Sequence, residues 1–499
     1  MRYLLCSLLS IPLAAQHVVR DSTTALSLRS GNTEMTIEKD GFRFGFASRR
    51  NNLHIAAHPE SGLLIGAADS LDQAQPIAQT SFLDCETGAC RFAVRTKSGL
   101  KADVEVAFDD RGARMKITPE HSEPSTVLVQ TAGAAPAYGL ADHAGFELKS
   151  TDITGYRRDD FLSGRPGSTR LVSNFAIYPK HGFALVLLDP GRKIVRSSER
   201  EIVQGVHSTR EAAEMHFFFG SPKEIYRAYL EVRNQRGYPV MQPKYEFFGV
   251  GWEAFGALGW ETNHRTVTEN VERYLDLGYP LRWMVVGSGF WPRHDPLLHA
   301  TTSFGMYDPK LYPEPQSFID RFHKLGLKFI HGLRISFIVG GPFSEEGAGK
   351  GYFLEENGKP QVFRIGFPKS PCYLLDAHKP EAVAWYMNLV RKWTDYGVDG
   401  FKEDLYGFGK YPLRDDKIDP VNEAMMKAGL FVMGRNGYIG SPADLHRVND
   451  FNYDQNQDRG PINALALAYS GFPLVYPDIV GGTFGENRFD VSVTRRMKT

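Results

Sequence analysis

The sequence predicts a chain of class α/β plus β, with an N-terminal β-sandwich followed by a (β/α)8-type TIM barrel. From about residue 20 to 220, apolar and polar residues alternate over short runs separated by turn residues, as in packed sheets. From residue 245, strand patterns alternate with helical patterns, which favours parallel βαβ units. Seven strand candidates in that second part favour a barrel over an open sheet.

The sandwich prediction rests on short strand-like runs. Three phenylalanines alternate with charged or small residues over 42–46, and the run 102–108 repeats this alternation. The run 183–188 is apolar throughout, which is typical of a strand buried on both faces. The polar stretch 134–169 is expected to be rich in loops and to project toward a partner domain.

The barrel part repeats one unit, in which a helix ends at Leu-Gly or Tyr-Gly and a strand begins two residues later. Such glycines stand at Gly278, Gly326 and Gly397, where helices commonly stop. Thr266 with Glu269 three residues later reads as a capping box and predicts a helix start there. The seven expected strands lie at 247–252, 281–286, 328–333, 398–401, 430–434, near 447 and at 472–476.

The composition indicates a globular protein without a strong charge preference. The chain has 499 residues, which suggests two or three domains. Lysine plus arginine and aspartate plus glutamate each number 58, so the net charge is zero. This balance argues against a general role in binding nucleic acid or anionic membranes.

The first fifteen residues have the pattern of an export signal. Arg2 supplies the positive start, 3–13 the apolar core, and Ala14 and Ala15 the small residues of a cleavage site. A buried first strand is the alternative interpretation. The predicted organisation is therefore a signal peptide at 1–15, the sandwich with its linker at 16–240 and the barrel at 241–499. We expect a secreted or periplasmic protein without a membrane span, because no later run reaches roughly 18 to 20 apolar residues.

The cysteines predict one disulfide. Cys85 and Cys90 flank a turn between two apolar runs, which favours a hairpin disulfide in an oxidising compartment. Cys6 leaves with the signal, and Cys372 is expected to be unpaired and buried. The spacing of the cysteines does not suggest a zinc site.

Asp404 is the first candidate for chemistry. It ends the run Gly400-Phe-Lys-Glu-Asp404, at the C-terminal end of a predicted strand, where parallel α/β folds place their active sites. Lys402 lies two residues earlier, so both side chains share one face of the strand, and the cation favours the ionised carboxylate. A strand-end acid that only caps a helix or forms a surface ion pair is the alternative.

Polar residues follow three later strands in the same way. They are Arg435, the acid-rich run 447–458 and Asp478. In a barrel these positions converge on one mouth. Two carboxylates that face each other there can serve as nucleophile and general acid/base for glycoside cleavage. An arginine near the acid can position it or bind a hydroxyl group.

The run 450–458 also has a competing interpretation. Its aspartates and asparagines alternate like the first ligands of a calcium loop. However, Gln455 stands where such a loop needs glycine, and Pro461 stands where the bidentate acid belongs. A solvated polar loop is the simpler alternative, and we predict no metal site.

Taken in order, several segments resemble glycoside hydrolase family 31, which contains α-glucosidases, α-xylosidases, α-galactosidases and sulfoquinovosidases. The run 217–229 is similar to the family's lead-in to its barrel, and 307–315 resembles its aspartate-to-proline helix start. The run 400–404 resembles the nucleophile motif, and 478–482 resembles the substrate-binding motif of the seventh strand. The similarity covers about 215–490.

The resemblance implies roles for individual residues. Asp404 would be the nucleophile and Asp450 the acid/base, with Asp454 as the alternative if the loop register shifts. Arg435 is similar to the family's strand-five arginine. With Lys402 and Asp478 it would bind hydroxyl groups or a substituent.

Aromatic residues are expected to complete the sugar pocket. Trp252 and Trp291 would shape it, and Phe290 with Trp291 resembles an aromatic pair that stacks on a sugar face. Ser288 stands where family members usually carry a sugar-binding aspartate, and we place it among the substrate-binding residues. The type of sugar therefore stays open among α-glucosides, α-xylosides, α-galactosides and anionic sugars.

The expected function is that of a retaining exo-α-glycosidase, which hydrolyses terminal α-linked sugars of an oligosaccharide or glycoside and needs no cofactor. The chain ends at Thr499, soon after the seventh predicted strand, so the barrel is expected to be incomplete at its C-terminus. The alternative is a non-catalytic or degenerate carbohydrate-binding homologue, which would bind sugar without turnover.

Overall fold

The protein is described by a computed structural model. It describes residues 16–66, 73–86, 88–120, 125–140, 151–161, 171–188, 192–208, 212–235, 244–287, 290, 292, 295, 298–300, 304–365, 368–403, 419–434, 437–438, 442–447, 459–471 and 474–476.

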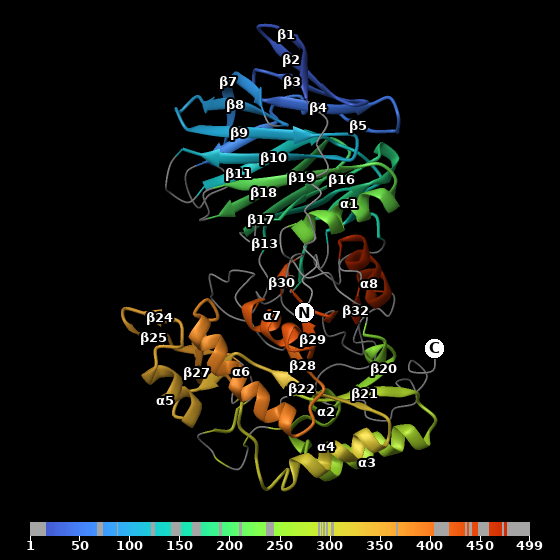
Figure 1. Cartoon of the computed structure of the whole chain (residues 1–499), viewed down its shortest axis with the longest axis vertical. Helices are drawn as coiled ribbons and strands as arrows, with labels where there is room; N and C mark the ends of the chain where they lie inside the picture. Colours follow the sequence, from blue (N-terminus) through green and yellow to red (C-terminus); the bar gives the residue numbers. More distant parts are fainter. Residues whose placement is uncertain are drawn as a thin grey trace, which may run out of the picture. The chain divides into compact units, whose positions relative to one another are not determined.

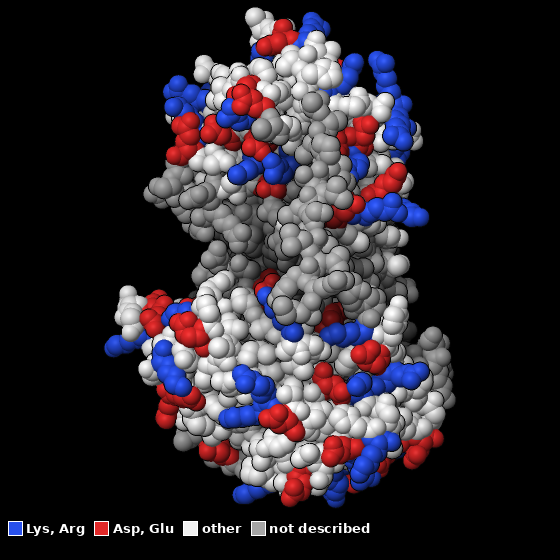
Figure 2. All heavy atoms as spheres, in the orientation of Figure 1, with Lys and Arg blue, Asp and Glu red and all other residues white. Residues whose placement is uncertain are grey.

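The chain divides into two compact units. Unit 1 consists of residues 1–138, 152–160 and 174–232, and unit 2 consists of residues 139–151, 161–173 and 233–499. Parts of the polar stretch that we expected to project toward a partner domain therefore belong to unit 2. Figure 1 shows the chain coloured along its sequence. On the face drawn in Figure 2, acidic and basic side chains are interspersed.

Unit 1 is built from two sheets, one of five strands in the order β1-β2-β3-β4-β5 and a larger, mainly antiparallel one. Its strands and the helices that begin in it are β1 (His17–Asp21), β2 (Ala25–Ser30), β3 (Thr33–Glu38), β4 (Arg43–Ser48), β5 (His54–Ile55), β6 (Leu63–Gly66), β7 (Gln75–Glu86), β8 (Ala89–Thr96), β9 (Lys101–Phe108), β10 (Gly112–Pro119), β11 (Ser125–Ala132), β12 (Tyr138–Gly139), β13 (Tyr156–Phe161), β15 (Ala176–Tyr178), η2 (Pro179–His181), β16 (Phe183–Leu187), β17 (Arg192–Ser197), β18 (Glu201–Ser208), β19 (Ala213–Phe219) and α1 (Pro222–Gln235).

Phenylalanine rings join the two sheets of unit 1. Phe44 of β4 packs edge-on against Phe217 of β19, with ring centroids 5.8 Å apart, and Phe46 lies 5.3 Å from Phe219. All four side chains are buried, which stabilises the sandwich through the removal of large apolar surfaces from water. The predicted sandwich is confirmed, and so is the predicted disulfide between Cys85 and Cys90, which links β7 to β8.

Unit 2 contains a parallel sheet of seven strands in the order β20-β21-β22-β28-β29-β31-β32. These are β20 (Val250–Glu253), β21 (Leu281–Val286), β22 (Lys328–Leu333), β28 (Gly400–Glu403), β29 (Phe431–Gly434), β31 (Leu445–Arg447) and β32 (Val475–Tyr476). Each of the seven predicted strands matches one of them, and sequence order equals spatial order, as the alternation of strands and helices predicted. The ring of Trp283 on β21 lies 4.9 Å from that of Tyr476 on β32, so the sheet curls.

The helices and smaller strands of unit 2 lie between or beside these strands. They are β14 (Leu171–Val172), η3 (Tyr245–Phe247), α2 (Ala254–Leu258), η4 (Gly259–Glu261), α3 (His264–Asp276), α4 (Pro315–Lys324), β23 (Ser336–Ile338), α5 (Pro342–Gly349), β24 (Glu355–Glu356), β25 (Lys359–Pro360), β26 (Phe363–Arg364), β27 (Pro371–Leu374), α6 (Pro380–Asp395), α7 (Asp419–Lys427), β30 (Gly437–Tyr438) and α8 (Arg459–Tyr469). Among the described residues, no helix combines the length and apolar character needed to cross a membrane.

The recurring helix-to-strand unit has one structural basis. Gly278, Gly326 and Gly397 have φ values of 81°, 79° and 101°, a left-handed conformation that disfavours other residues. In each case the amide after the glycine donates back to a carbonyl in the last helical turn, at 3.0–3.1 Å. This Schellman geometry satisfies helix-end carbonyls and turns the chain toward the next strand.

Helix α3 starts earlier than the sequence predicted. Its N-cap is Asn263, whose side chain accepts hydrogen bonds from the amides of Arg265 and Thr266 at 3.0 and 3.1 Å. The hydroxyl of Thr266 in turn accepts from the amide of Asn263 at 3.1 Å. The predicted box at Thr266 and Glu269 was therefore wrong by three residues, because asparagine is as good a cap as threonine and stands one turn earlier.

An acidic residue fastens the N-terminal end of the sheet. The Asp399 carboxylate accepts hydrogen bonds from the Phe329 amide, from Nε2 of His323 and from Nζ of Lys328, each at 2.8 Å. Its side chain is 17% exposed. The cluster ties α4 and β22 to the start of β28 at the barrel end that supports stability rather than chemistry.

Candidate active site

The strands of unit 2 present two different faces. One cluster of buried side chains includes Trp252, Phe401 and Val432 together with residues of α3, α4 and α6, and so marks the helix side of the sheet. A second cluster lies on the opposite, inner side. Its members are Phe247, Trp283, Val285, Ile330, Phe431, Met433 and Leu445. A strand residue that belongs to one of these clusters lies on that face of the sheet. Its neighbours along the strand point to the opposite face, because side chains alternate between the two faces.

Lys402 points to the inner face. It follows Phe401, which belongs to the helix side, and it pairs in register with Met433, which belongs to the inner cluster. Its side chain is only 2% exposed. Because β28 ends at the next residue, the ammonium group lies at the C-terminal end of the parallel strands. Lys402 thus lies on β28, and its role in sugar binding stays a prediction.

Glu253 is the partner of Lys402. Lys402 Nζ donates to Glu253 Oε1 in a close ion pair that joins β28 to β20. Glu253 ends β20, pairs in register with the inner residue Val285, and has a side chain that is 27% exposed. Removing one partner of such a buried pair typically costs about 3–5 kcal/mol, because the other charge stays buried without compensation.

Two glycines make room beside this pair. A Cβ atom on Gly332 would lie 2.8 Å from the Cα of Gly287, so the backbones after β21 and at the end of β22 approach too closely for any side chain. A Cβ atom on Gly287 would lie 3.6 Å from Oε1 of Glu253. Since β21 and β22 separate β20 from β28 in the sheet, their lack of side chains here lets Glu253 and Lys402 meet.

Buried polar groups also lie on the helix side at the same end. Glu403 is 0% exposed, and His446 of β31 is 1% exposed. An added Cβ on Gly434, between them in the sheet, would lie 3.8 Å from Glu403 Oε2 and 3.7 Å from His446 Cδ2. These groups face away from Lys402, so we assign them a structural role behind the inner face.

His331 occupies the centre of the helix-side layer. It is fully buried, and its ring lies 4.1 Å from Trp393 and 5.2 Å from Phe290, measured between ring centroids. Its Nδ1 donates to the Val286 carbonyl at 3.1 Å, which fixes the proton on that nitrogen. Burial lowers the pKa of His331 from 6.5 to about 3, so the imidazole is neutral at physiological pH.

The structure corrects the expectation for one aromatic residue and relocates another. Phe290 is 0% exposed and stacks on Tyr312 at 4.2 Å, so the predicted stacking of Phe290 on a sugar is wrong. Trp252 packs in the helix-side cluster, on the face of β20 opposite to Glu253, and is 5% exposed. Its ring therefore lies behind the strand, and the packing gives no support to its predicted place in the pocket.

The other predicted site residues lie outside the described residues, and their roles stay predictions. They are Asp404, Asp450, the alternative Asp454, Ser288, Trp291, Arg435 and Asp478, together with the acidic run 450–458. Within the described residues, no cluster of three or more His, Cys, Asp or Glu side chains is arranged to hold a metal ion. Cys372 is buried and unpaired, as predicted, and burial raises the pKa of its thiol to about 12.

Glu253 is not among the residues predicted from the sequence, although the sequence carries a signal for it. The expected first strand ends at Trp252, whereas β20 ends at Glu253. Glu253 therefore did not count as a strand-end residue. The rule that selected Asp404, an acid at the C-terminal end of a barrel strand, also applies to Glu253.

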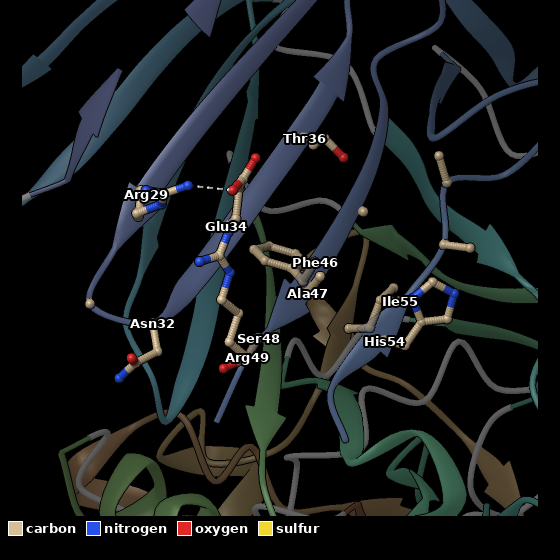
Figure 3. A pocket seen from close by; sticks show the side chains of 14 residues that line it. Arg29, Asn32, Glu34, Thr36, Phe46, Ala47, Ser48, Arg49, His54 and Ile55 are labelled. Atoms are coloured by element: carbon tan, nitrogen blue, oxygen red, sulfur yellow. Dashed lines mark hydrogen bonds and ion pairs between the residues drawn. The ribbon is translucent and has the colours of Figure 1, made fainter. Parts of the chain in front are cut away.

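A separate cavity lies in unit 1, on the sheet of β2, β3, β4 and β5. It has a volume of about 530 Å³ and is lined by polar side chains that include Arg29, Glu34, Arg49 and His54. Figure 3 shows Arg29 and Glu34 pointing toward each other, and their ion pair measures 2.9 Å. The cavity contains none of the predicted site residues, so we do not connect it with the barrel chemistry.

Comparison with known proteins identifies the barrel. Residues 239–488 match the model of the glycosyl hydrolases family 31 TIM-barrel domain. An α-xylosidase of Emericella nidulans is 24% identical over 274 residues, which cover 54% of this chain and 33% of that protein. The α-xylosidase XylQ of Lactiplantibacillus pentosus is 23% identical over 56% of this chain and 35% of its own length. The chain thus spans about a third of the length of these curated relatives.

Solved structures agree on the fold. A family 31 sulfoquinovosidase from E. rectale, in complex with an aza-sugar inhibitor, superposes with a TM-score of 0.68 at 14% identity, over 93% of this chain and 76% of that chain. A family 31 α-xylosidase from a soil metagenome, complexed with xylose, gives 0.59 at 13% identity, over 96% and 74%. At these identities the similarity establishes the arrangement of strands and helices.

Proposed function

Because this chain belongs to glycoside hydrolase family 31, we propose that it is a retaining exo-α-glycosidase that removes terminal α-linked sugars. The observation that carries the proposal is the position of Lys402, buried on the inner face at the end of β28. Asp404 follows two residues later, and the two-residue period of a strand would direct it to the same face. The named relatives, α-xylosidases and an α-glucosidase, support this class of substrate.

The proposed mechanism uses two carboxyl groups. Asp404 attacks the anomeric carbon, a carboxylate–carbon bond forms, and the glycosidic bond breaks. Asp450 gives its proton to the departing oxygen in this step. In the second step Asp450 takes a proton from water, the water oxygen bonds to the anomeric carbon, and Asp404 is released. The sugar keeps its α configuration after the two inversions.

The remaining predicted residues would bind the sugar. We propose that Lys402 donates hydrogen bonds from the inner face, and that Ser288, Trp291, Arg435 and Asp478 contact hydroxyl groups or the ring. The substrate is an α-glucoside, an α-xyloside or an α-galactoside. The apolar start of the sequence further supports export, to a secreted or periplasmic location.

The test compares the wild type with Asp404→Ala on a panel of nitrophenyl α-xyloside, α-glucoside and α-galactoside. We expect turnover to fall by at least 1,000-fold, because the covalent step needs this carboxylate. A 5-fluoroglycosyl fluoride should label one residue, and mass spectrometry of peptides should place the sugar on Asp404. Unchanged turnover in the variant, or a label elsewhere, would refute the assignment. Sugar binding without turnover in the wild type would favour a non-catalytic homologue.

For the second carboxylate, Asp450→Ala is compared with Asp454→Ala. Azide should restore turnover only in the variant that lacks the true acid/base, because the small anion attacks the glycosyl-enzyme without needing a general base. Rescue of Asp454→Ala instead of Asp450→Ala would transfer the role to Asp454.

A further inference from the structure

We propose that Glu253 is a positioning and specificity-determining residue, which neutralises Lys402 and so adapts the barrel mouth to uncharged sugars. This inference rests on the proposed function, because it concerns the substrate class of the same site. It adds a residue outside the predicted set, and it chooses between the neutral and anionic sugars that the sequence left open.

The ammonium group of Lys402 is buried. A lysine side chain that is 2% exposed has lost nearly all of its hydration, and such a cation persists only with a counter-charge and hydrogen bonds. Glu253 Oε1 supplies both in the ion pair. Since Glu253 stays 27% exposed, the carboxylate is the member of the pair that also faces solvent.

The fold leaves room for the pair of Glu253 and Lys402. β20 and β28 are not neighbours in the sheet, because β21 and β22 lie between them. Side chains on the inner face of those two strands would separate the charges. Gly287 and Gly332 stand there, and a Cβ atom on Gly332 would meet the Gly287 Cα at 2.8 Å. The close packing of the two backbones thus keeps the space between Glu253 and Lys402 free of other side chains.

The ion pair also sets the direction of the lysine donors. An ammonium group has three N–H donors on a flexible stem, and it reorients easily unless one donor is held. Glu253 holds one and thereby fixes the orientation of the group. A donor with a fixed orientation suits the hydroxyl groups of a neutral sugar, because hydrogen bonds to a hydroxyl group depend on the direction of the donor more than on its charge.

The consequence for selectivity follows from the charge of the pair. A sugar with a carboxylate or sulfonate beside Lys402 meets the like charge of Glu253, which disfavours its binding. Without Glu253 the same position would offer a buried cation without its carboxylate partner, and an anionic sugar would replace that partner. Glu253 therefore acts against anionic ligands as well as for neutral ones.

The experiment measures sugar affinity with the full chain by isothermal titration calorimetry. The probes are D-xylose, D-glucose and D-glucuronate, and the variants are Glu253→Gln, Glu253→Asp and the double variant Glu253→Gln/Lys402→Gln. For Glu253→Gln we expect at least a tenfold loss of affinity for the best neutral sugar and at least a tenfold gain for D-glucuronate. Glu253→Asp, which keeps the charge, should retain the neutral preference.

Two controls separate specificity from folding. Glu356, an exposed residue of β24, serves as the matched control, and Glu356→Gln should bind all three sugars as the wild type does. The double variant should lose the gained affinity for D-glucuronate, because the cation that attracts it is gone. Thermal unfolding of each variant shows whether it folds. If Glu253→Gln does not fold, the wild type carries the test, because binding D-glucuronate as tightly as D-xylose or D-glucose, or more tightly, overturns the inference.

The outcomes are distinct. An unchanged ratio of neutral to anionic affinity in Glu253→Gln overturns the inference, and so does a wild type that binds none of the three sugars. The same tenfold shifts in the double variant would also overturn it, since they would not depend on Lys402. An affinity shift as expected, in a protein that hydrolyses no α-glycoside, would support the inference and refute the proposed function alone.

Discussion

The buried imidazole of His331 predicts that unit 2 loses stability in mild acid. The perturbation is a change of pH from 7.5 to 4.5, with His331→Leu as the comparison variant. In the folded protein burial holds the pKa of His331 at about 3, whereas an unfolded histidine titrates near 6.5. Between pH 3 and pH 6.5 the histidine is protonated in the unfolded chain and neutral in the folded chain, so protonation favours unfolding. The free energy of unfolding therefore has its full value above pH 6.5 and decreases as the pH falls toward 3.

The magnitude follows from the two pKa values. Linkage gives a loss of about 1 kcal/mol at pH 5.5 and about 3 kcal/mol at pH 4.5, relative to neutral pH, for a histidine shifted from 6.5 to about 3. The aromatic surroundings explain why the folded chain does not stabilise a charged imidazole. The rings of Phe304, Trp393 and Phe401 lie 5.9, 4.1 and 6.3 Å from it, measured between ring centroids. A leucine fills this apolar site without a titratable group.

The assay is urea unfolding followed by tryptophan fluorescence and circular dichroism at several pH values. We expect the wild type to lose stability more steeply than His331→Leu, with a difference in slope that reaches about one proton per molecule below pH 5.5. The variant itself should be less stable at pH 7.5, since the Val286 carbonyl loses the hydrogen bond from Nδ1. His378, which is exposed, provides the control, and His378→Gln should keep the wild-type slope. Parallel pH profiles for the wild type and His331→Leu would refute the reasoning.

Three further predictions concern stability and reactivity. Gly397→Ala should destabilise unit 2 by roughly 2–3 kcal/mol, because φ is 101° and an added Cβ would lie 3.3 Å from two side chains of α4. Gly326→Ala meets nothing within 4 Å and should cost only about 1–2 kcal/mol, and equal values in urea unfolding would contradict this account. Asp399→Asn should cost about 2–4 kcal/mol because it weakens three hydrogen bonds, whereas Lys328→Met, at a side chain 40% exposed, should cost under about 1 kcal/mol. Cys372 should react with a thiol reagent at least 100-fold more slowly in the native protein than in denaturant, because it is buried and its pKa is about 12. Mass spectrometry would identify the labelled peptide, and fast native labelling of it would be the contrary result.

The sequence predicted the order of the barrel elements because local signals determine it. A left-handed glycine ends a helix for reasons that lie within a few residues, and Gly278, Gly326 and Gly397 were recognised on that basis. The apolar runs that follow them are short and continuous, which is typical of strands in parallel sheets. The same logic found the hairpin disulfide between Cys85 and Cys90.

The faces of the strands were harder to predict. In a parallel barrel both faces of a strand are buried, so an apolar run carries no polar alternation that separates inside from outside. For this reason Trp252 was expected in the pocket although it packs against the helices, and Phe290 was expected on a sugar although it stacks on Tyr312. The direction of each side chain depends on the register of neighbouring strands, which no local pattern contains.

The pair of Glu253 and Lys402 is a second case of information that lies outside any local window. The two residues are separated by 149 positions in sequence. Their contact depends on two glycines, Gly287 directly after β21 and Gly332 in β22. Lys402 was recognised through its neighbour Asp404, whereas Glu253 has no such neighbour within its own segment.

Unit 2 is not a continuous stretch of chain. β14 lies between two segments of unit 1 in sequence, yet it pairs in parallel with β30, more than half the length of the chain away. Ser173, next to β14, donates to the Ser470 carbonyl at 3.0 Å, and both serines are buried. A gene fragment that encodes only residues 233–499 would therefore lack a strand and an anchoring hydrogen bond of its own unit. During synthesis on the ribosome, these contacts form only after residue 470 has emerged, so we expect this part of the molecule to fold after unit 1.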